Sequence, residues 1–202
     1  MRNNKVQKMV SVAMLAAIAV VLQFVAFPII PAFSFLKIDF SDIPVLIGMF
    51  LFGPLAGIST AFIRSVLHLF MTGASPQNLV GDGASFLATV IFTLPMYVFF
   101  KKGGHHAKNK IFGVVTGIAA MTLFMSIANY FVITPLYLKL FGVSAGEFLG
   151  MSLQRYVTIG IVPFNLIKGA IVSVVFLILH AKLLPWLIKK EHHLNNKITS
   201  IK

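Results

Sequence analysis

Long apolar stretches alternate with short polar segments along this chain. Five stretches stand out, at residues 9–30, 43–72, 83–100, 111–141 and 157–188. Several of them exceed the roughly 18 residues that mark a candidate membrane-spanning helix. A single soluble core in a chain of 202 residues could not hide so much apolar surface. The pattern therefore predicts an all-α polytopic membrane protein.

The positions of the basic residues predict how the chain is oriented. Of the 17 Lys and Arg residues, 12 fall toward the two ends of the chain or between residues 100 and 111. Three lie in segments on the other side (Lys37, Lys139 and Arg155), and two, Arg64 and Lys168, lie inside apolar stretches. Because cytoplasmic segments of membrane proteins carry the excess of Lys and Arg, we expect both termini to be cytoplasmic. The first stretch is longer than the core of a signal peptide, so we expect a retained helix.

Parity divides the second stretch into two helices. The first helix exits outward and the stretch 83–100 ends at a cytoplasmic basic pair, so residues 43–72 must cross an even number of times. Gly53-Pro54 marks the turn, because proline disfavours helix at its predecessor and suits a helix start. We predict one integral membrane domain over 1–202, with six helices and a polar cytoplasmic tail at 191–202. The helices are expected at about 9–30, 43–52, 54–72, 83–100, 111–141 and 157–188. The second is short, and the last two are long and expected to kink at Pro135 and Pro163.

Composition limits the chemistry that the chain can carry out. Hydrophobic residues make up 58% and charged residues 11%, against about 45–50% and about a quarter in ordinary soluble domains. The absence of cysteine excludes disulfides, thiolate metal sites and a cysteine nucleophile. No Walker loop or dinucleotide fingerprint occurs, so we expect that the chain itself hydrolyses no ATP. We expect neither a metal site nor a catalytic cofactor.

Lys168 is the most informative polar residue. It lies about 11 residues, or roughly 16 Å, into the last predicted helix. A lysine at such depth costs about 2.5–3.5 kcal/mol, so it should face protein or a cavity. Asn165 shares its helix face, and Asn129 is expected at a similar depth on the preceding helix. We expect no intramembrane carboxylate to neutralise Lys168, which favours a polar ligand site over interhelical hydrogen bonding alone.

Two further polar positions admit alternative interpretations. Arg64 and His68 lie one turn apart, and we favour an Arg64 that binds backbone carbonyls or reaches an interface over an anion or proton site. Ser85 follows Gly83-Ala84 and lies at a depth compatible with His68, which leaves an intramembrane hydrolase as an alternative hypothesis.

The outer loops contain candidate ligand contacts. The first loop, 33–42, mixes apolar and polar residues, and the second, 73–83, contains glycines that permit close approach of the backbone to a ligand. Candidates from these loops and from the cavity walls are Asp39, Ser41, Asp42, Leu46, Met49, Asn78, Gly81, Asp82 and Gly83. On the first helix, Ala13 and Ala17 form a small-residue face for another helix, within the chain or outside it.

These features together resemble a known family. The six helices, the break at Gly53-Pro54, the stretches 36–44 and 52–57 and the alanine face of the first helix resemble the substrate-binding S components of energy-coupling factor (ECF) vitamin transporters. Within that family, Asn129 with Asn165-Leu-Ile-Lys168-Gly169 is most similar to the riboflavin-specific subunits.

The resemblance implies a function and a set of partners. It implies a high-affinity riboflavin-binding subunit in the bacterial cytoplasmic membrane, in which Asn129, Asn165 and Lys168 hold the isoalloxazine ring and the two outer loops close over it. It implies that Ala13 and Ala17 dock on a transmembrane coupling protein driven by two cytoplasmic ATPases, so that the chain is not itself an enzyme. Alternatives are an S component for pantothenate, thiamine or biotin, a hydrolase, or a membrane scaffold. A phosphorylated flavin would be attracted by Lys37 or Arg64.

Overall fold

The computed structural model describes the backbone of residues 2–102 and 107–199, and the side chains of residues 5–101 and 107–182. The first half contains helix α1 (Arg2–Phe24), a hairpin of strands β1 (Phe27–Pro28) and β2 (Lys37–Ile38) with the 3-10 turn η1 (Pro31–Phe33) between them, and helices α2 (Asp42–Phe52), α3 (Pro54–Thr72) and α4 (Pro76–Lys102). The second half contains α5 (Ala107–Ala128), the π-helical turn η2 (Asn129–Ile133), α6 (Thr134–Phe141), α7 (Ala145–Leu149), α8 (Leu153–Tyr156), the π-helical turn η3 (Val157–Ile161) and α9 (Val162–Thr199).

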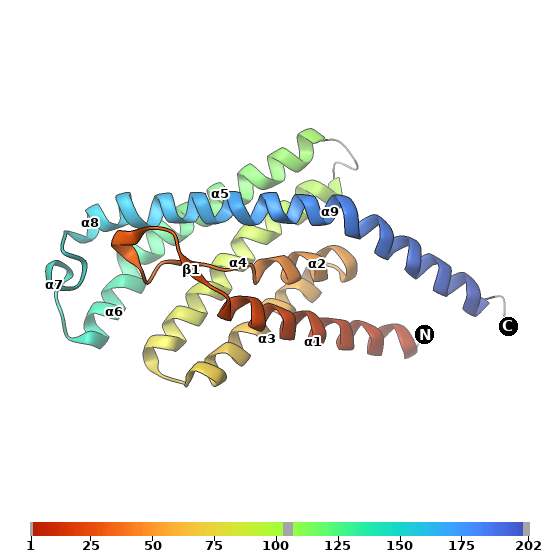
Figure 1. The fold of residues 1–202 in the computed structure, drawn as a ribbon, viewed down its shortest axis with the longest axis horizontal. Helices are drawn as coiled ribbons and strands as arrows, with labels where there is room; N and C mark the ends of the chain where they lie inside the picture. The colour runs from red at the N-terminus through yellow and green to blue at the C-terminus, as the bar shows by residue number, and fades with distance from the viewer. Residues whose placement is uncertain (1, 103–106, 200–202) are drawn as a thin grey trace.

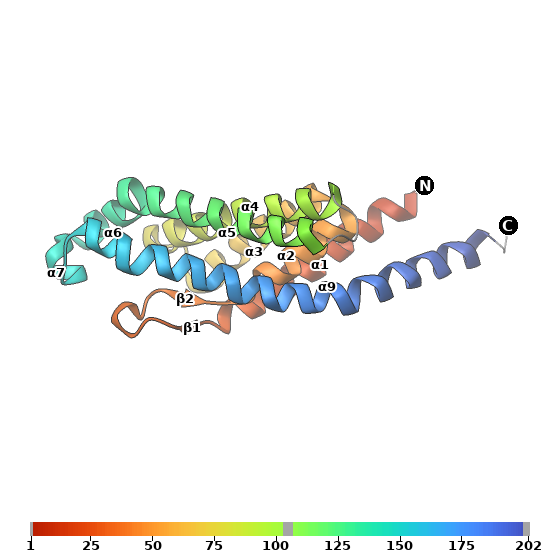
Figure 2. The same cartoon turned by 90° about the horizontal axis from the view of Figure 1, so that it is seen from above.

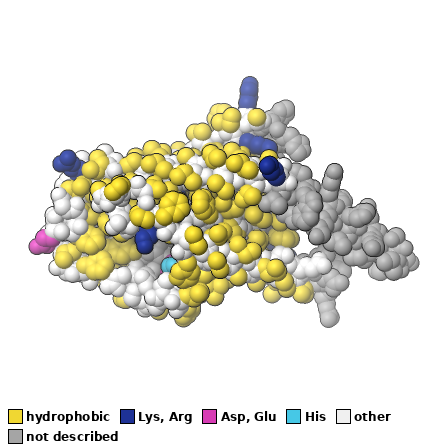
Figure 3. Space-filling model, viewed as in Figure 1, with side chains coloured by type: hydrophobic (Ala, Val, Ile, Leu, Met, Phe, Trp, Pro, Cys, Tyr) yellow, Lys and Arg dark blue, Asp and Glu magenta, His cyan; other side chains and the backbone are white. Residues whose placement is uncertain are grey.

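The helices form an elongated bundle. The start of α1 and the end of α9 point to the same end of it, whereas the hairpin and α7 lie at the opposite end (Figure 1). From above, α4 and α5 lie on one side and α9 with the hairpin on the other, with α2 between them (Figure 2). Hydrophobic side chains cover most of the face in Figure 3, and few charged atoms interrupt it. Such a surface suits contact with lipid rather than water.

The prediction of six helices is confirmed. In the part of the chain that the structure describes, five helical stretches are long and apolar enough to span a membrane, and α2 is a shorter apolar helix. The break between α2 and α3 falls at Gly53, where φ is 94°, a backbone conformation that glycine adopts without strain. Pro54 then opens α3 at a position where its missing N–H costs no hydrogen bond.

The short helix α2 lies inside the bundle. It contacts α1, α3, α4 and α9, and its residues Val45, Leu46 and Met49 are fully buried. At Gly57, an added Cβ would lie 2.6 Å from the Cβ of Met49, so the glycine allows α3 to pack tightly on α2. Protein neighbours therefore surround a helix that is too short to span a bilayer alone.

Two predicted helix boundaries were wrong. The first helix ends at Phe24 rather than at residue 30, because Phe27 and Pro28 pair with Ile38 and Lys37 in the hairpin. The fourth helix begins at Pro76 rather than at residue 83, so residues 76–83 are helical and the second outer loop shrinks to 73–75. Proline suits the first turn of a helix, so Pro76 can begin α4. Residues 76–83 then satisfy their backbone hydrogen bonds within the helix, which an apolar environment favours over a loop.

Both long helices contain a π-helical turn close to a proline. η2 comes just before Pro135 and η3 just before Pro163, at the positions where kinks were predicted. Proline removes a backbone donor, and π turns locally reorganise the helical hydrogen bonds, often at functional sites. After the second π turn, α9 continues to Thr199, so most of the predicted polar tail is helical in its backbone.

Candidate functional site

A cavity of about 400 Å³ is lined in part by residues of the hairpin segment, α6 and α7. These elements lie at the end of the bundle opposite the start of α1 (Figure 1). The hairpin segment, α4, α5 to α6 and α7 to α9 all contribute to its wall. Its lining is mainly apolar and aromatic, and includes Phe35, Met125, Ile133, Phe141, Phe148, Tyr156 and Phe164. The polar lining residues include Asp39, Ser85, Asn129, Asn165 and Lys168. Apolar walls with a few converging polar groups are typical of a small-molecule site.

Asn129, Asn165 and Lys168 all line this cavity. Asn129 begins η2, and Asn165 follows η3 on α9, so each asparagine lies next to a π-helical turn. The Nδ2 atoms of Asn129 and Asn165 donate to the Met125 and Ile161 carbonyls, each at 2.8 Å. Each amide keeps a second N–H and further acceptor capacity for a ligand.

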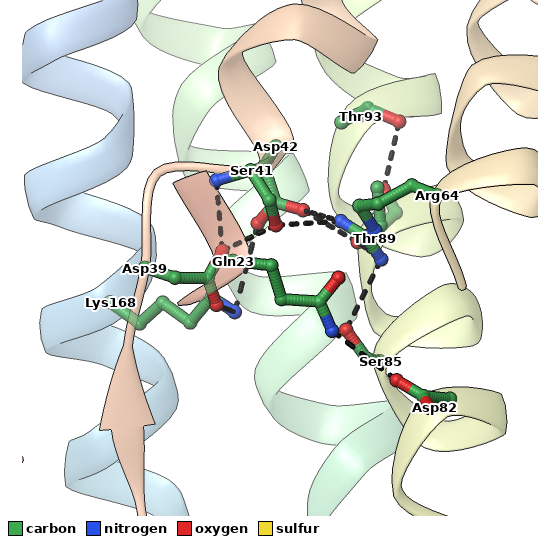
Figure 4. Close-up of polar contacts among 10 residues, drawn as sticks. All are labelled: Gln23, Asp39, Ser41, Asp42, Arg64, Asp82, Ser85, Thr89, Thr93 and Lys168. Atoms are coloured by element: carbon green, nitrogen blue, oxygen red, sulfur yellow. Dashed lines mark hydrogen bonds and ion pairs between the residues drawn. The ribbon is translucent and has the colours of Figure 1, made fainter. Parts of the chain in front are cut away.

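Lys168 has carboxylate partners, contrary to the prediction. Its Nζ lies 3.5 Å from Asp39 Oδ2 and 3.8 Å from Asp42 Oδ2 (Figure 4). The prediction placed both aspartates in an outer loop, but the segment after β2 turns into the bundle, where Asp39 and Asp42 are 7% and 1% exposed. The ion pairs therefore depend on the hairpin, which periodicity along the chain does not reveal.

Arg64 is fully buried and forms the centre of a second layer of polar contacts. Its Nη1 donates to Ser41 Oγ at 2.8 Å and to Asp42 Oδ1 at 3.2 Å. Its Nη2 donates to Ser85 and Thr89, each at 3.1 Å (Figure 4). The prediction that Arg64 binds backbone carbonyls or reaches an interface was therefore wrong, because acidic and hydroxyl side chains of α2 and α4 reach it first.

The charged groups at and directly behind the cavity wall balance in charge. Lys168 and Arg64 supply two positive charges, and Asp39 and Asp42 supply two negative ones. Asp39 Oδ1 also accepts hydrogen bonds from the backbone N–H and the hydroxyl of Ser41. We name the group of Asp39, Ser41, Asp42, Arg64, Thr89 and Lys168 the charge cluster. Its formal net charge is zero.

Six of the other predicted contact residues fall into three groups. Asp39 and Gly81 line the cavity, and Ser41 and Asp42 belong to the part of the charge cluster that does not line it. Leu46 and Met49 are fully buried in the protein core and are not among the residues that line the cavity.

The three remaining predicted residues on α4 point elsewhere. Asn78 caps the end of α3, because its Nδ2 donates to the carbonyls of Thr72 (3.1 Å) and Gly73 (2.8 Å). Asp82 lies 2.7 Å from His68 and accepts from Gln23 at 3.3 Å. An added Cβ at Gly83 would meet no atom within 4 Å, so this glycine lies in open space.

The hydrolase hypothesis lacks a nucleophile and base in contact. Ser85 accepts a hydrogen bond from Arg64, whereas Nδ1 of His68 lies against Asp82. Among the residues that the structure describes, no group of three His, Cys, Asp or Glu side chains could hold a metal ion.

An aromatic wall is the part of the site that the sequence analysis missed. Tyr137, Phe148 and Tyr156 come from the segment around α6, α7 and α8. The Tyr137 hydroxyl donates to the Gln77 carbonyl at 3.0 Å, and an added Cβ at Gly81 would lie 2.8 Å from that hydroxyl. The aromatic residues between 130 and 156 were a visible signal for this wall.

The small-residue face of α1 points away from the bundle. Ala13 and Ala17 are exposed, whereas Ala16 and Ala19 are fully buried against the other helices. Ala13 and Ala17 therefore do not serve packing within the chain.

Comparisons with known proteins agree with this architecture. The family described as "ECF transporter, substrate-specific component" matches residues 7–180. The chain is 42% identical to "Riboflavin transporter FmnP" of Bacillus subtilis (strain 168) over 183 residues, 91% of this chain and 95% of that protein. It is 38% identical to "Riboflavin transporter RibU" of Staphylococcus aureus (strain TCH60) over 187 residues, 93% of this chain and 94% of that protein.

A solved structure shares the fold. It is described as "Structure and mechanism of the S component of a bacterial ECF transporter", and it superimposes with a TM-score of 0.74 at 36% identity. The match covers 91% of this chain and 98% of that one. The chain therefore belongs to the substrate-specific components of ECF transporters, which are multi-pass membrane transport proteins and not enzymes.

Proposed function

We propose that this chain is the riboflavin-binding subunit of an ECF importer and that its ligand occupies the cavity described above. The observation that carries the proposal is that Asn129, Asn165 and Lys168 line one cavity with aromatic walls. Its volume of about 400 Å³ falls within the range of small-molecule sites. The relatives named riboflavin transporters add support at 38–42% identity.

The chemistry of flavin suits these residues. The uracil-like edge of the isoalloxazine ring alternates carbonyl acceptors with an imide N–H donor, and an asparagine amide carries both a donor and an acceptor. Lys168 donates to a ring carbonyl or nitrogen without losing its proton. The rest of the ring is flat and apolar, and Phe141 and Phe164 offer it aromatic surface.

The charge cluster removes one objection to a neutral ligand. Riboflavin brings no charge that could neutralise a buried lysine. Asp39 and Asp42 already do so, because both carboxylates lie within 4 Å of Lys168 Nζ. An uncharged ligand therefore enters a site whose charges are already paired.

Uptake requires partners in this proposal. The chain takes up vitamin B2 together with a transmembrane coupling protein, which contacts the exposed face of Ala13 and Ala17, and two cytoplasmic ATPases. It does so in the bacterial cytoplasmic membrane with both termini inside, an orientation that agrees with the excess of Lys and Arg near the termini. The hairpin segment covers the ligand, while the second outer loop, only three residues long at 73–75, contributes less cover than its sequence suggested.

A fluorescence titration tests the ligand. Buried flavin loses its fluorescence, so adding riboflavin to the purified, flavin-free protein should give saturable quenching that excess pantothenate, thiamine or biotin does not reverse. We expect Lys168→Ala to weaken the affinity at least tenfold. The matched control is Lys139→Ala, since Lys139 is exposed on α6 and does not line the cavity. Absence of quenching, or reversal by another vitamin, would refute the riboflavin assignment.

A further inference from the structure

We propose that Arg64 and Asp42, which do not line the cavity, set its preference for an uncharged flavin over a phosphorylated one. This inference rests on the proposed riboflavin function. Both side chains lie one contact behind the wall: Asp42 reaches the lining residue Lys168 at 3.8 Å, and Arg64 reaches the lining residue Ser85 at 3.1 Å. They act on the ligand through charge and not through contact.

Because these two residues are buried, their charges act on a ligand over a longer distance than exposed charges do. The side chains of Arg64 and Asp42 are 0% and 2% exposed, so little water screens them. In a buried environment the effective dielectric constant is about 20 rather than 80, and charges interact several times more strongly than in water. A phosphate carries a charge of about −1.5 to −2 at neutral pH. The binding free energy of a phosphorylated flavin therefore depends on the net charge of the cluster.

The cluster offers such a ligand no net attraction. One negative charge of Asp42 offsets one positive charge of Arg64 at 3.2 Å, and Asp39 offsets Lys168 at 3.5 Å. Both Nη atoms of Arg64 donate to side chains of the protein, namely Ser41, Asp42, Ser85 and Thr89. The side chain is also fully buried and does not line the cavity, so it does not contact a phosphate there.

Two neighbouring charged groups do not alter this balance. Asp82 lies against His68 at 2.7 Å and has no contact with the cluster, so its charge is the same in the native protein and in variants of the cluster. Lys37 lines the cavity but is exposed, so water and salt screen its charge far more than that of the cluster. Lys37 therefore acts equally in the native protein and in variants of the cluster.

Removing one charge should change the preference in a direction fixed by its sign. Asp42→Asn keeps the shape of the side chain and leaves the cluster with one excess positive charge, because arginine does not deprotonate in proteins. Arg64→Gln leaves one excess negative charge. The double variant restores a net charge of zero. A purely structural defect has no such sign, so opposite shifts in the two single variants identify an effect of charge.

The test measures dissociation constants for riboflavin and for flavin mononucleotide, by fluorescence quenching at neutral pH, in the full-length protein and its variants. The readout is the ratio of the two constants within each variant, which does not depend on the fraction of protein that is folded. We expect Asp42→Asn to favour the phosphorylated flavin by at least about tenfold. Two unit charges about 10 Å apart at an effective dielectric constant of about 20 give an effect of about this size, and the phosphate carries more than one charge. Arg64→Gln should shift the ratio the other way, and the double variant should return toward the native ratio.

Thr89→Val provides the matched control. Thr89 donates to Asp42 at 2.5 Å and accepts from Arg64 at 3.1 Å, so this substitution removes hydrogen bonds from the same cluster but no charge. It should leave the ratio within twofold of the native value. An unchanged ratio in Asp42→Asn, or shifts of the same sign in the two single variants, would overturn the inference. If Arg64→Gln does not fold, the contrast between Asp42→Asn and Thr89→Val decides alone. Failure of the native protein to bind either flavin would instead refute the proposed function.

Discussion

The Nζ atom of Lys168 lies 3.5 Å from Oδ2 of Asp39. Lys168 belongs to the long helix α9, whereas Asp39 follows strand β2 of the hairpin, so one ion pair joins two distant segments of the cavity wall. The same lysine lies 3.8 Å from Asp42, in the first turn of α2. A change in the charge of Lys168 therefore affects both the cavity wall and the first turn of α2, the short helix inside the bundle.

The first prediction concerns the coupling between Lys168 and Asp39. Removing one member of a buried ion pair leaves the other charge unpaired, which costs about 3–5 kcal/mol, whereas removing both costs less. We expect Lys168→Met and Asp39→Asn each to lower the melting temperature of the ligand-free protein in detergent. The decrease in melting temperature of the double variant should be smaller than the sum of the decreases in the two single variants. Additive decreases would mean that the two side chains do not interact.

The second prediction concerns the packing of the hairpin segment against η3. An added Cβ at Gly160 would lie 2.9 Å from Cε2 of Phe33, whose ring packs on Tyr156 with centroids 5.2 Å apart. Overpacking costs about 1–3 kcal/mol, so Gly160→Ala should displace the Phe33 ring and weaken the packing of the hairpin on η3. Because the hairpin covers the ligand in our proposal, the rate of flavin dissociation should rise at least fivefold. Stopped-flow recovery of flavin fluorescence measures this rate.

Gly146→Ala is the control for that experiment. Gly146 lies in α7 near the same end of the molecule, and an added Cβ there would meet no atom within 4 Å. Its dissociation rate should equal that of the native protein. Equal rates in Gly160→Ala and Gly146→Ala would show that the contact between Phe33 and Gly160 does not hold the hairpin closed.

Much of the fold follows from local features of the sequence. The lengths of the apolar stretches, the basic clusters and Gly53-Pro54 predicted the six helices and the break between α2 and α3. Depth along a single helix also predicted that Lys168 and Asn165 lie together, because that distance depends only on helix geometry.

What could not be predicted depends on contacts between distant segments. Asp42 and Arg64 are 22 residues apart, and their pairing requires the hairpin to turn the start of α2 into the bundle. The glycine-rich segment at 76–83 was predicted as a loop from its composition, yet it is helical. Composition alone underestimates how strongly an apolar environment favours hydrogen-bonded backbone.

The third prediction concerns the packing of the central helix. At Gly57, an added Cβ would lie 2.6 Å from Cβ and 2.9 Å from Cε of Met49, and 3.0 Å from the Val45 carbonyl oxygen. Only the Met49 Cε can move cheaply, so we expect Gly57→Ala to destabilise the protein by about 1–3 kcal/mol. Gly83→Ala should leave stability unchanged or raise it slightly, because Gly83 is an exposed helical position with open space around it. Thermal unfolding of both variants in one detergent gives the comparison.

The last prediction separates binding from coupling. Ala13 and Ala17 are exposed on α1 and do not line the cavity, so tryptophan at either position should leave the flavin dissociation constant within twofold of the native value. If the coupling protein packs closely on this face, the bulky ring blocks its approach, and uptake of labelled riboflavin by cells should fall at least tenfold.

Leu123→Trp is the matched control for both measurements. Leu123 is 65% exposed on α5, so its replacement adds the same ring to a lipid-facing surface of a different helix. Uptake by this variant should remain near the native level. Loss of uptake in all three variants would point to a general effect of the added ring on membrane insertion. Native uptake in Ala13→Trp and Ala17→Trp would contradict the docking role of the α1 face, because a partner at that surface has no room for an indole ring.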